Sequence, residues 1–286
     1  MPMSNLTTRE AARLLHVSEA TVKRWADDGL LRPEKTVGGH RRFSIQAIAR
    51  LRRERGLDAH NQQQRKKVGA TPTLSPATLL ELLLHGAESE AGAALIDSYL
   101  HGDSLATLFD YTITETMHQV GDLWFKGTIT VADEHLATRV VLSALEKLRG
   151  IVVPAEPTGL KAICCGIEGD LHEVPIHLAE MLLEKEGWEV LNLGPNTPLF
   201  ALRDMVAQQR PQLVCIAAKR ITDLDRLVIE YGQLRKVTEK IDALAVLGGE
   251  GVRDVTLRER LPADFYGEDF AGFSTFLRKF KPKGRT

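Results

Sequence analysis

The chain has 286 residues, of which 43% are hydrophobic and 26% are charged, and this composition is typical of a globular protein with two or three domains. It contains no apolar run of the roughly 18 residues that a membrane-spanning helix needs, and its N-terminus lacks the basic and apolar regions of a signal peptide. The cysteines Cys164, Cys165 and Cys215 lie within apolar runs and form no CxxC motif, which favours buried free thiols over a metal site. These features exclude a transmembrane protein and a disulfide-bonded secreted protein, and they predict a cytoplasmic one.

Charge is distributed unevenly along the chain, although its sum is only −1. Residues 1–67 carry 15 Lys/Arg and 7 Asp/Glu, a net charge of +8, so the rest of the chain carries −9. A basic N-terminal region on an acidic body predicts that this region meets a polyanion such as a nucleic acid.

The first segment with helical periodicity begins at a capping box formed by Thr7 and Glu10. After a short break, Ser18 can cap a second helix, on which Val22 and Trp25 share one face. This position favours Trp25 as a core residue rather than as a stacking platform. Two short helices joined by a tight turn predict a helix-turn-helix, whose second helix enters the major groove of DNA.

A short hairpin is predicted to follow these helices. Residues 30–32 and 42–43 are expected to pair as strands, with Gly38 and Gly39 at the tip. Apolar spacing from Ile45 to Leu51 predicts a further amphipathic helix. The hairpin would form a wing that points three basic side chains at DNA phosphates, namely His40, Arg41 and Arg42.

The stretch LTTREAARLLHVSEATVKRWADDGLLRP, followed by GGHRRF, resembles the DNA-binding domain of the MerR family over about residues 5–56. The resemblance implies a winged helix-turn-helix domain in residues 1–57 that binds a pseudo-palindromic operator as a dimer. It also implies DNA contacts, which the sequence does not divide between bases and phosphates, from Thr21, Lys23, Arg24, His40, Arg41 and Arg42.

Residues 58–75 are polar and contain Gly and Pro, so they are predicted to form a linker rather than a dimerising coiled coil. Beyond them, helical periodicity dominates residues 76–156, in segments punctuated by glycines. The segments have the lengths and short connections of an antiparallel four-helix bundle, and they cover residues 76–87, 91–102, 104–127 and 130–150.

Within the predicted bundle, Trp124 is followed nine residues later by Glu134 and His135. A tryptophan near a helix end is usually a core residue, and a glutamate in a first helical turn can simply complement the helix dipole. The residues alone therefore leave open whether this group binds anything.

From residue 157 the pattern changes to short apolar runs that alternate with helical segments. The runs are residues 161–167, 188–194, 212–219 and 243–249, and a last strand near 264–267 precedes a final helix at 268–280. This alternation predicts a Rossmann-like, doubly wound α/β domain in residues 157–286. In such domains ligands bind at the carboxyl ends of the strands, which is where EGDLHEVP and LGGEG lie.

His172 lies at such a strand end, with Asp170 two residues before it. A neutral imidazole binds metal through one nitrogen, while a carboxylate on the other nitrogen fixes its tautomer. No cysteine or second histidine lies at a zinc spacing, so a metal held in its own macrocycle, which needs one protein ligand, suits the motif better. An exposed loop histidine is the alternative.

The motif Asp170-Leu171-His172, with Gly248-Gly249 in an α/β pattern, resembles the cobalamin-binding domain of methionine synthase and methylmalonyl-CoA mutase. The resemblance implies that His172 is the lower axial ligand to cobalt and that Asp170 supports it. It places the remaining cofactor contacts of this domain at Glu173, Ala217, Lys219, Gly248 and Gly249.

The order of the domains, with Trp124, Glu134 and His135, is similar to that of CarH-type photoreceptor repressors over nearly the whole chain. In that group the tryptophan covers the upper face of adenosylcobalamin, which is bound between the helical cap and the α/β domain. The resemblance implies a light-controlled, DNA-binding regulator that acts as a homo-oligomeric repressor. It also implies that the protein is not an enzyme and has no catalytic residue.

The sequence departs from these patterns at several positions. Pro175 replaces a glycine, Ala217 and Lys219 lie where a hydroxyl-bearing motif is expected, and Phe125 lies where such photoreceptors carry a histidine. One alternative is therefore a regulator of the same fold that binds no cobalamin or holds another tetrapyrrole. A second is a corrinoid methyl carrier, although such a carrier has no use for a basic wing.

Overall fold

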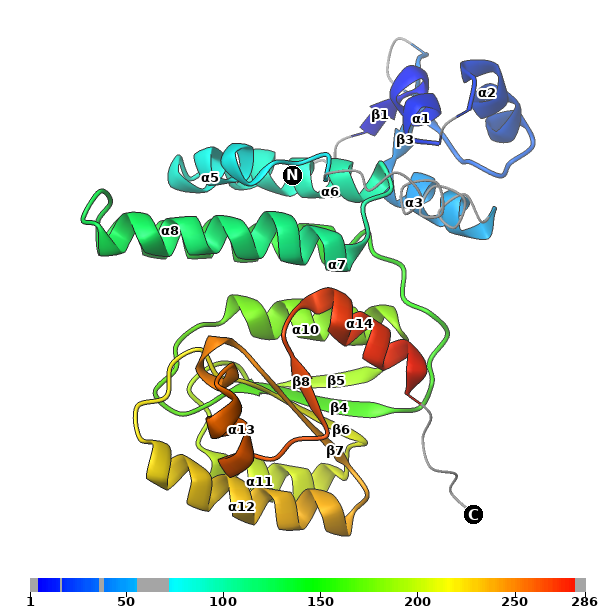
Figure 1. Ribbon diagram of the computed structural model, residues 1–286. Coiled ribbons are helices and arrows are strands. Elements are labelled where there is room, and N and C mark those ends of the chain that lie inside the picture. The colour runs from blue at the N-terminus through cyan, green and yellow to red at the C-terminus, as the bar shows by residue number, and fades with distance from the viewer. Residues whose placement is uncertain (1–4, 16, 36–38, 56–71, 281–286) are drawn as a thin grey trace. The chain divides into compact units, whose positions relative to one another are not determined.

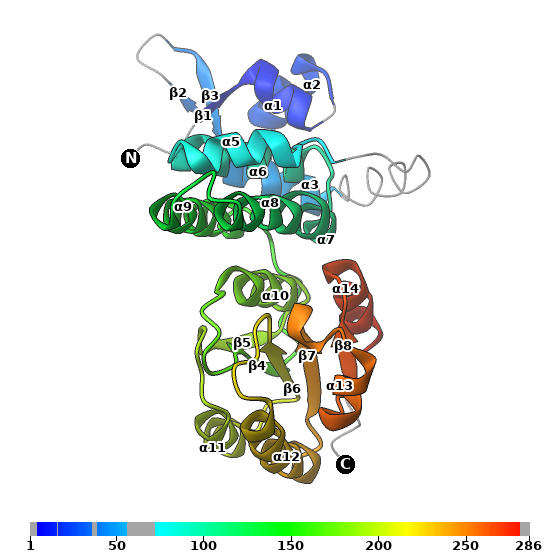
Figure 2. The same cartoon turned by 60° about the vertical axis from the view of Figure 1, so that its left-hand side comes forward.

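The computed structural model describes residues 5–15, 17–35, 39–55 and 72–280, which form two compact units that divide between Val153 and Pro154. Figures 1 and 2 show the elements of each unit. No helix within the described residues is long and apolar enough to cross a membrane.

The first unit begins with the predicted helix-turn-helix, in which α1 (Thr8–Leu14) is followed by α2 (Glu19–Asp27). The capping box is present, because the Thr7 N–H donates to the Glu10 carboxylate at 2.7 Å and the Glu10 N–H donates to Thr7 Oγ1 at 3.2 Å. Ser18 caps α2 by accepting from the Thr21 N–H at 3.1 Å. Both predicted caps are therefore confirmed, and Trp25 is buried as expected.

The predicted wing strand at residues 30–32 is wrong. The strand that pairs with β3 (Arg41–Ser44) is β2 (Glu34–Lys35), and β3 also pairs with β1 (Asn5–Thr7), which was not predicted. Leu30 and Leu31 instead donate their backbone N–H groups to the Trp25 carbonyl, at 2.9 and 3.1 Å, and so complete the end of α2. The predicted tip at Gly38 lies outside the described residues, whereas the predicted third helix is confirmed as α3 (Ile45–Glu54).

The four predicted bundle helices are confirmed. They are α5 (Pro76–Leu84), α6 (Glu88–Leu100), a continuous helix from α7 (Leu105–Thr107) to α8 (Glu115–Phe125), and α9 (Val131–Arg149). The continuous helix contains a π-helical segment, η1 (Leu108–Thr114), which periodicity did not predict. Helices α6 and α9 approach closely, since a Cβ at Gly92 would lie 2.6 Å from the Lys147 side chain.

The N-terminal head, formed by the described residues between 5 and 55, shares a hydrophobic core with the bundle. Leu100 at the end of α6 and Ile151 after α9 are buried in the same cluster as Leu15, Trp25 and Phe43 of the head. Residues 58–71, which make up most of the predicted linker, lie outside the described residues. Its last residues are bound to the bundle, because the Thr73 N–H donates to the buried Asp103 at 2.9 Å and Ser75 caps α5.

The second unit is a parallel sheet with helices on both faces. Its strands are β4 (Lys161–Gly166), β5 (Glu189–Asn192), β6 (Leu213–Ala217), β7 (Leu244–Gly248) and β8 (Phe265–Gly267), in the order β5-β4-β6-β7-β8. In Figure 1, α10 (Val174–Lys185) and α14 (Phe270–Lys279) cover one face, and α11 (Leu199–Gln209) and α12 (Leu224–Lys240) cover the other. All five predicted strands are confirmed, and the short segments η2 (Glu250–Val252) and α13 (Val255–Arg260) are additional.

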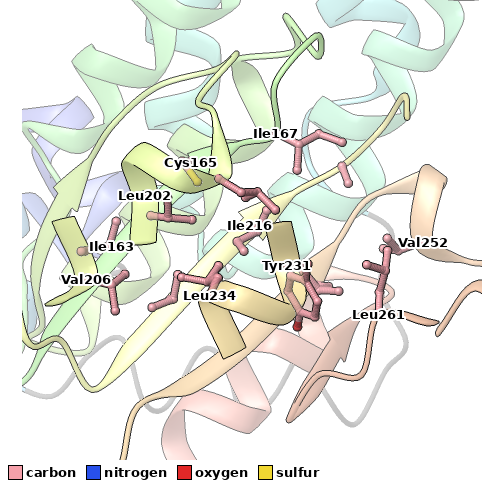
Figure 3. Close-up of a cluster of buried hydrophobic side chains, with 14 residues drawn as sticks. Ile163, Cys165, Ile167, Leu202, Val206, Ile216, Tyr231, Leu234, Val252 and Leu261 are labelled. Atoms are coloured by element: carbon pink, nitrogen blue, oxygen red, sulfur yellow. The ribbon is translucent and has the colours of Figure 1, made fainter. Parts of the chain in front are cut away.

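Alternate side chains of the central strands form the core of this unit, as Figure 3 shows. Ile163 and Ile216 lie in one buried cluster with Leu202 and Leu234, which come from the two helices on that face. The three cysteines are free and buried, as predicted. Burial raises the pKa of the Cys165 thiol to about 12, so this thiol stays protonated at neutral pH.

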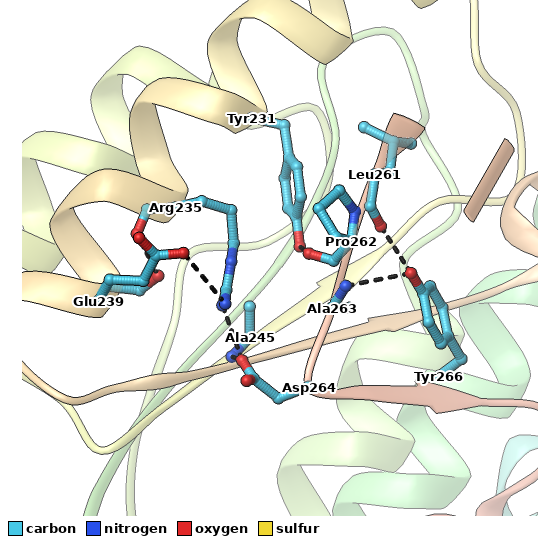
Figure 4. A network of polar contacts seen from close by, with 10 residues as sticks. Tyr231, Arg235, Glu239, Ala245, Leu261, Pro262, Ala263, Asp264 and Tyr266 are labelled. Carbon is cyan, nitrogen blue, oxygen red and sulfur yellow. Dashed lines mark hydrogen bonds and ion pairs between the residues drawn. The ribbon is translucent and has the colours of Figure 1, made fainter. Parts of the chain in front are cut away.

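Polar contacts hold the edge strand β8, as Figure 4 shows. Asp264 accepts from Arg235 of α12 and from the Ala245 N–H of β7, both at 2.7 Å. The Tyr231 hydroxyl donates to the Pro262 carbonyl at 2.9 Å. These bonds attach the segment before β8 to strand β7 and to helix α12. They therefore stabilise β8 as the edge strand of the sheet.

Candidate functional site

The strand order places a topological switch point between β4 and β6. Counted within the unit, the order is 2-1-3-4-5, and the chain leaves β4 and β6 toward opposite sides of the sheet. The loop after β4 therefore lies beside the loop after β6 at the carboxyl edge of the sheet. Asp170 and His172 lie in the first of these loops, and Lys219 and Arg220 lie in the second.

The carboxylate of Asp170, which is only 2% exposed, joins the two loops. One oxygen accepts from the backbone N–H groups of Lys219 and Arg220, at 2.6 and 3.2 Å. The other accepts from the His172 N–H at 3.1 Å and lies 2.6 Å from His172 Nδ1. Burial alone would raise the pKa of Asp170, but these hydrogen bonds outweigh it and lower the pKa below its usual value. The group is therefore an anion at neutral pH.

His172 presents its second ring nitrogen for binding. Its side chain is 46% exposed, and Nδ1 is engaged by the carboxylate of Asp170. With a proton on Nδ1, the Nε2 lone pair is available, and Nε2 has no partner among the residues that the structure describes. A single, carboxylate-oriented imidazole at a switch point suits a metal whose other ligands come with a macrocycle. The described residues hold no group of three or more His, Cys, Asp or Glu that could bind a metal by themselves.

The two glycines at the end of β7 differ in whether the structure could accept a side chain in their place. Gly249 has a φ of 104°, and a Cβ there would lie 2.6 Å from the Ala218 carbonyl oxygen, so only glycine fits. At Gly248 a Cβ would meet nothing closer than the Gly267 carbonyl oxygen at 3.5 Å, which is an ordinary contact. Ala217 is partly exposed at the end of β6, while Ala218 is buried against the Gly249 loop.

The remaining predicted residues flank these two loops. Lys219 is half-buried, and its backbone rather than its side chain holds Asp170. Glu173 precedes α10 and approaches His177 of the same helix at 3.3 Å. Pro175 lies in the first turn of α10, where a missing N–H breaks no helical hydrogen bond, so this departure is compatible with the helix start.

The sequence did not predict which residues of other elements form hydrogen bonds and ion pairs with the His172 loop. Asn196 of the β5–α11 loop bonds both Gly169 and Asp170, and Arg226 of α12 pairs with Glu168 at 2.6 Å. No local pattern marks these residues, because their contacts depend on which strands are neighbours.

In the first unit, Trp124 and Phe125 end α8 and are 50% and 88% exposed. This exposure contradicts the alternative that Trp124 is a core residue. Glu134, in the first turn of α9, accepts from the Thr138 hydroxyl at 3.2 Å, and His135 beside it is exposed. The capping box of α9 uses Asp133, so Glu134 is left for another role. The end of the bundle at the α8–α9 turn thus presents an indole, a carboxylate and an imidazole.

The head presents a basic surface on α2. Val22 and Trp25 are buried, while Lys23 and Arg24 are exposed, and Thr21 is partly exposed with its hydroxyl 2.9 Å from Ser18 Oγ. The exposed face of α2 therefore carries the predicted DNA contacts.

The three basic residues of the wing differ in their surroundings. His40 is exposed and Arg42 is partly exposed. Arg41 donates to the Asp27 carboxylate at 2.7 Å and to the Lys23 carbonyl at 3.2 Å. These two bonds brace α2 against β3, which gives Arg41 a positioning role beside its predicted phosphate contact.

This difference predicts distinct effects of two substitutions. Arg42→Ala should weaken binding to all DNA sequences alike and lower the slope of log K against log salt by about one unit. Arg41→Ala should instead reduce selectivity, because α2 loses its brace. Fluorescence anisotropy with specific and unrelated duplexes at several salt concentrations measures both quantities. The positioning role would be contradicted if Arg41→Ala weakened binding to all duplexes equally and changed the salt slope more than Arg42→Ala does.

Comparisons with known proteins identify two domains in the chain. The model of the helix-turn-helix domain matches residues 6–56, and that of the B12 binding domain matches residues 77–149. The HTH-type transcriptional repressor CarA of Myxococcus xanthus is 28% identical over 234 residues, which cover 75% of this chain and 77% of that protein. The HTH-type transcriptional repressor CarH of the same organism is 25% identical over 230 residues, covering 71% and 75%.

Among solved structures, the monomethylamine corrinoid protein of Methanosarcina barkeri has the same fold over 71% of this chain and 96% of its own. The TM-score is 0.60 at 17% identity, which is evidence for the fold alone. The chain therefore combines a helix-turn-helix domain with a B12 binding domain and is a homologue of the repressors CarA and CarH.

Proposed function

We propose that the protein is a transcriptional repressor whose affinity for its operator is controlled by adenosylcobalamin and by light. The observation that carries this proposal is the Asp170–His172 pair, with His172 Nε2 presented at the switch point of a chain that also carries a helix-turn-helix. The names of the homologous repressors support the direction of control. The proposed domains are a DNA-binding head in residues 1–57, a helical cap in residues 76–156 and a cobalamin domain in residues 157–286.

In this proposal His172 Nε2 is the lower ligand to cobalt, and Asp170 holds the imidazole in the required tautomer. When bound, adenosylcobalamin supplies a cobalt–carbon bond that visible light breaks. Residues at the ends of β6 and β7 and beside His172 would hold the rest of the corrinoid, namely Glu173, Ala217, Lys219, Gly248 and Gly249. In this proposal Trp124, Glu134 and His135 of the first unit would contact the adenosyl group of the cofactor.

Control of DNA binding follows from linkage. If the holoprotein assembles into a dimer or tetramer, its paired heads bind two half-sites with a gain in avidity. A rearrangement of the cap that weakens assembly then lowers operator affinity by the same coupling free energy.

The test is an absorbance spectrum of the reconstituted full-length protein before and after green light, with operator binding measured in parallel. The operator can be selected by the wild-type protein from a random DNA library. The expected result is an adenosylcobalamin spectrum that changes on illumination, together with a loss of the shifted DNA band. No corrinoid uptake with intact DNA binding would indicate a cobalamin-independent regulator, and methyl transfer without DNA binding would indicate a corrinoid carrier.

Trp124 should select the upper ligand. Its exposed indole can pack on an adenine, so Trp124→Ala should bind methylcobalamin about as well as adenosylcobalamin, whereas the wild type prefers the adenosyl form. The melting temperature of the cofactor-free variant should hardly change, because half of the indole is already in solvent. Titrations with both corrinoids and thermal melts check this expectation. A loss of several kcal/mol in the cofactor-free protein would show that the indole stabilises the bundle instead.

A further inference from the structure

One side chain outside the proposed cofactor contacts fastens the loop that carries His172. Asn196 Oδ1 accepts from the Gly169 N–H at 2.8 Å, and the Asn196 N–H donates to the Asp170 carbonyl oxygen at 2.9 Å. A single residue of the β5–α11 loop thus holds both ends of the Gly169–Asp170 dipeptide. His172 lies two residues beyond this clamp.

The backbone at both ends of the clamp is restricted. Asn196 has a φ of 54°, in the left-handed region that asparagine and glycine tolerate best. Gly169 has a φ of 81°, and a Cβ there would lie 2.8 Å from Thr222 Oγ1. Position 196 therefore needs a residue that adopts a left-handed backbone and also offers a hydrogen-bond acceptor, and asparagine does both.

The clamp acts on the imidazole through Asp170. The Asp170 carboxylate is buried and accepts from backbone N–H groups of Lys219 and Arg220, while its 2.6 Å contact with Nδ1 orients the ring of His172. A displacement of the Asp170 backbone would lengthen that contact and free the ring to rotate. Asn196 holds the Asp170 backbone from the side opposite to the β6 loop, since it belongs to the loop after β5, the strand on the other side of β4.

We propose that Asn196 is a positioning residue that presets the Asp170–His172 pair for a metal before the corrinoid is bound, an inference that rests on the proposed function. It does not touch the cofactor. Its effect is to keep Nδ1 of His172 on the carboxylate and Nε2 available on the partly exposed side of the ring, so that binding of the metal need not order the loop. Partners that orient a metal-binding histidine typically contribute 10–100-fold to metal affinity, and we expect about tenfold here.

The decisive variant is Asn196→Gly, which keeps the left-handed backbone and removes the acceptor. Asn196→Asp keeps the acceptor and should behave more like the wild type than Asn196→Gly does. Asp242→Gly is the matched control, because Asp242 also has a positive φ, 62°, but precedes β7 at the opposite edge of the sheet. All three are made in the full-length chain.

Two measurements with corrinoid test the effect of Asn196 on cofactor affinity and on ligation by His172. Titration with hydroxocobalamin should show about tenfold weaker binding for Asn196→Gly than for the control. Electron paramagnetic resonance of the cob(II)alamin form should show a histidine nitrogen coupling in the wild type, and a mixture with a water-ligated signal in Asn196→Gly. Equal affinities and equal spectra for Asn196→Gly and Asp242→Gly would overturn the inference while leaving the proposed function intact.

A third measurement needs no cofactor. Nitrogen NMR of the imidazoles in the cofactor-free protein should show His172 as one tautomer, protonated on Nδ1, in the wild type and in Asp242→Gly. In Asn196→Gly the His172 signals should report a mixture of tautomers. If the wild type takes up no corrinoid, the proposed function fails, and this spectrum still decides on Asn196, because an unchanged His172 signal in Asn196→Gly would refute its positioning role.

Discussion

Replacing His172 by alanine should weaken cobalamin binding by at least about 100-fold, because the substitution removes the only protein atom proposed to bind the cobalt. The imidazole is partly exposed and, within the part of the chain that the structure describes, bonds only to Asp170, so the fold should be retained. Equilibrium titration followed by absorbance measures the affinity. In the cob(II)alamin form of any residual complex, the nitrogen coupling from histidine should be absent.

His85→Ala is the matched control for this experiment. His85 caps the end of α5, is exposed, and its Nδ1 lies 2.7 Å from the Glu81 carbonyl oxygen, so the same change is made at a helix end in the other unit. It should bind cobalamin like the wild type. An unchanged nitrogen coupling in His172→Ala would mean that another residue binds the cobalt, and the assignment of His172 would have to be abandoned.

The second large effect is expected in the head. Changing Lys23 and Arg24 together to alanine should reduce affinity for the selected operator by about 30-fold or more if both contact bases, since each base contact contributes about 1–3 kcal/mol. Both side chains are exposed on α2, whereas Val22 and Trp25 hold the helix in the core. The helix should therefore stay in place, and circular dichroism should confirm this.

The salt dependence of the same variant separates the two kinds of contact. If both residues neutralise phosphates, the slope of log K against log salt falls by about two units, and unrelated DNA is affected equally. If they contact bases, the slope hardly changes and the preference for the operator is lost. Arg260→Ala, which removes one exposed charge from α13 of the second unit, is the control and should leave both quantities unchanged. Full operator affinity in the double variant would exclude α2 as the DNA-binding surface.

Local sequence features were sufficient to predict most of the helices and all five parallel strands. The central strands are short runs of buried apolar residues such as Ile163 and Ile216, and the helix starts carry side-chain caps such as Ser18. The wing strand was misplaced because Leu30 and Leu31 look like a strand but complete the end of α2 through bonds to Trp25. The π-helical segment η1 has no counterpart in the hydrophobic pattern, because one wider turn hardly alters which residues face the core.

The candidate site was predictable in part for a similar reason. Asp170 and His172 are two residues apart, so the sequence itself contains their pairing. The backbone groups of Lys219 and Arg220 that hold Asp170 lie about 50 residues away, and they meet it only because β4 and β6 are neighbours. The role of Asn196 was not predicted either, because Asn196 meets the His172 loop only through the pairing of β4 with β5. Arg41 was predicted from its charge, yet its bonds to Asp27 and Lys23 depend on how the wing packs against α2.

The core shared by head and bundle has a mechanical consequence. Ile151, buried among head residues, lies two positions before Val153, the last residue of the first unit. Only a few peptide bonds therefore separate the start of the second unit from a residue that is buried in the core of the head. Leu100, the last residue of α6, is buried in the same core. A displacement of the chain after α9 should therefore be transmitted to the head through this shared core.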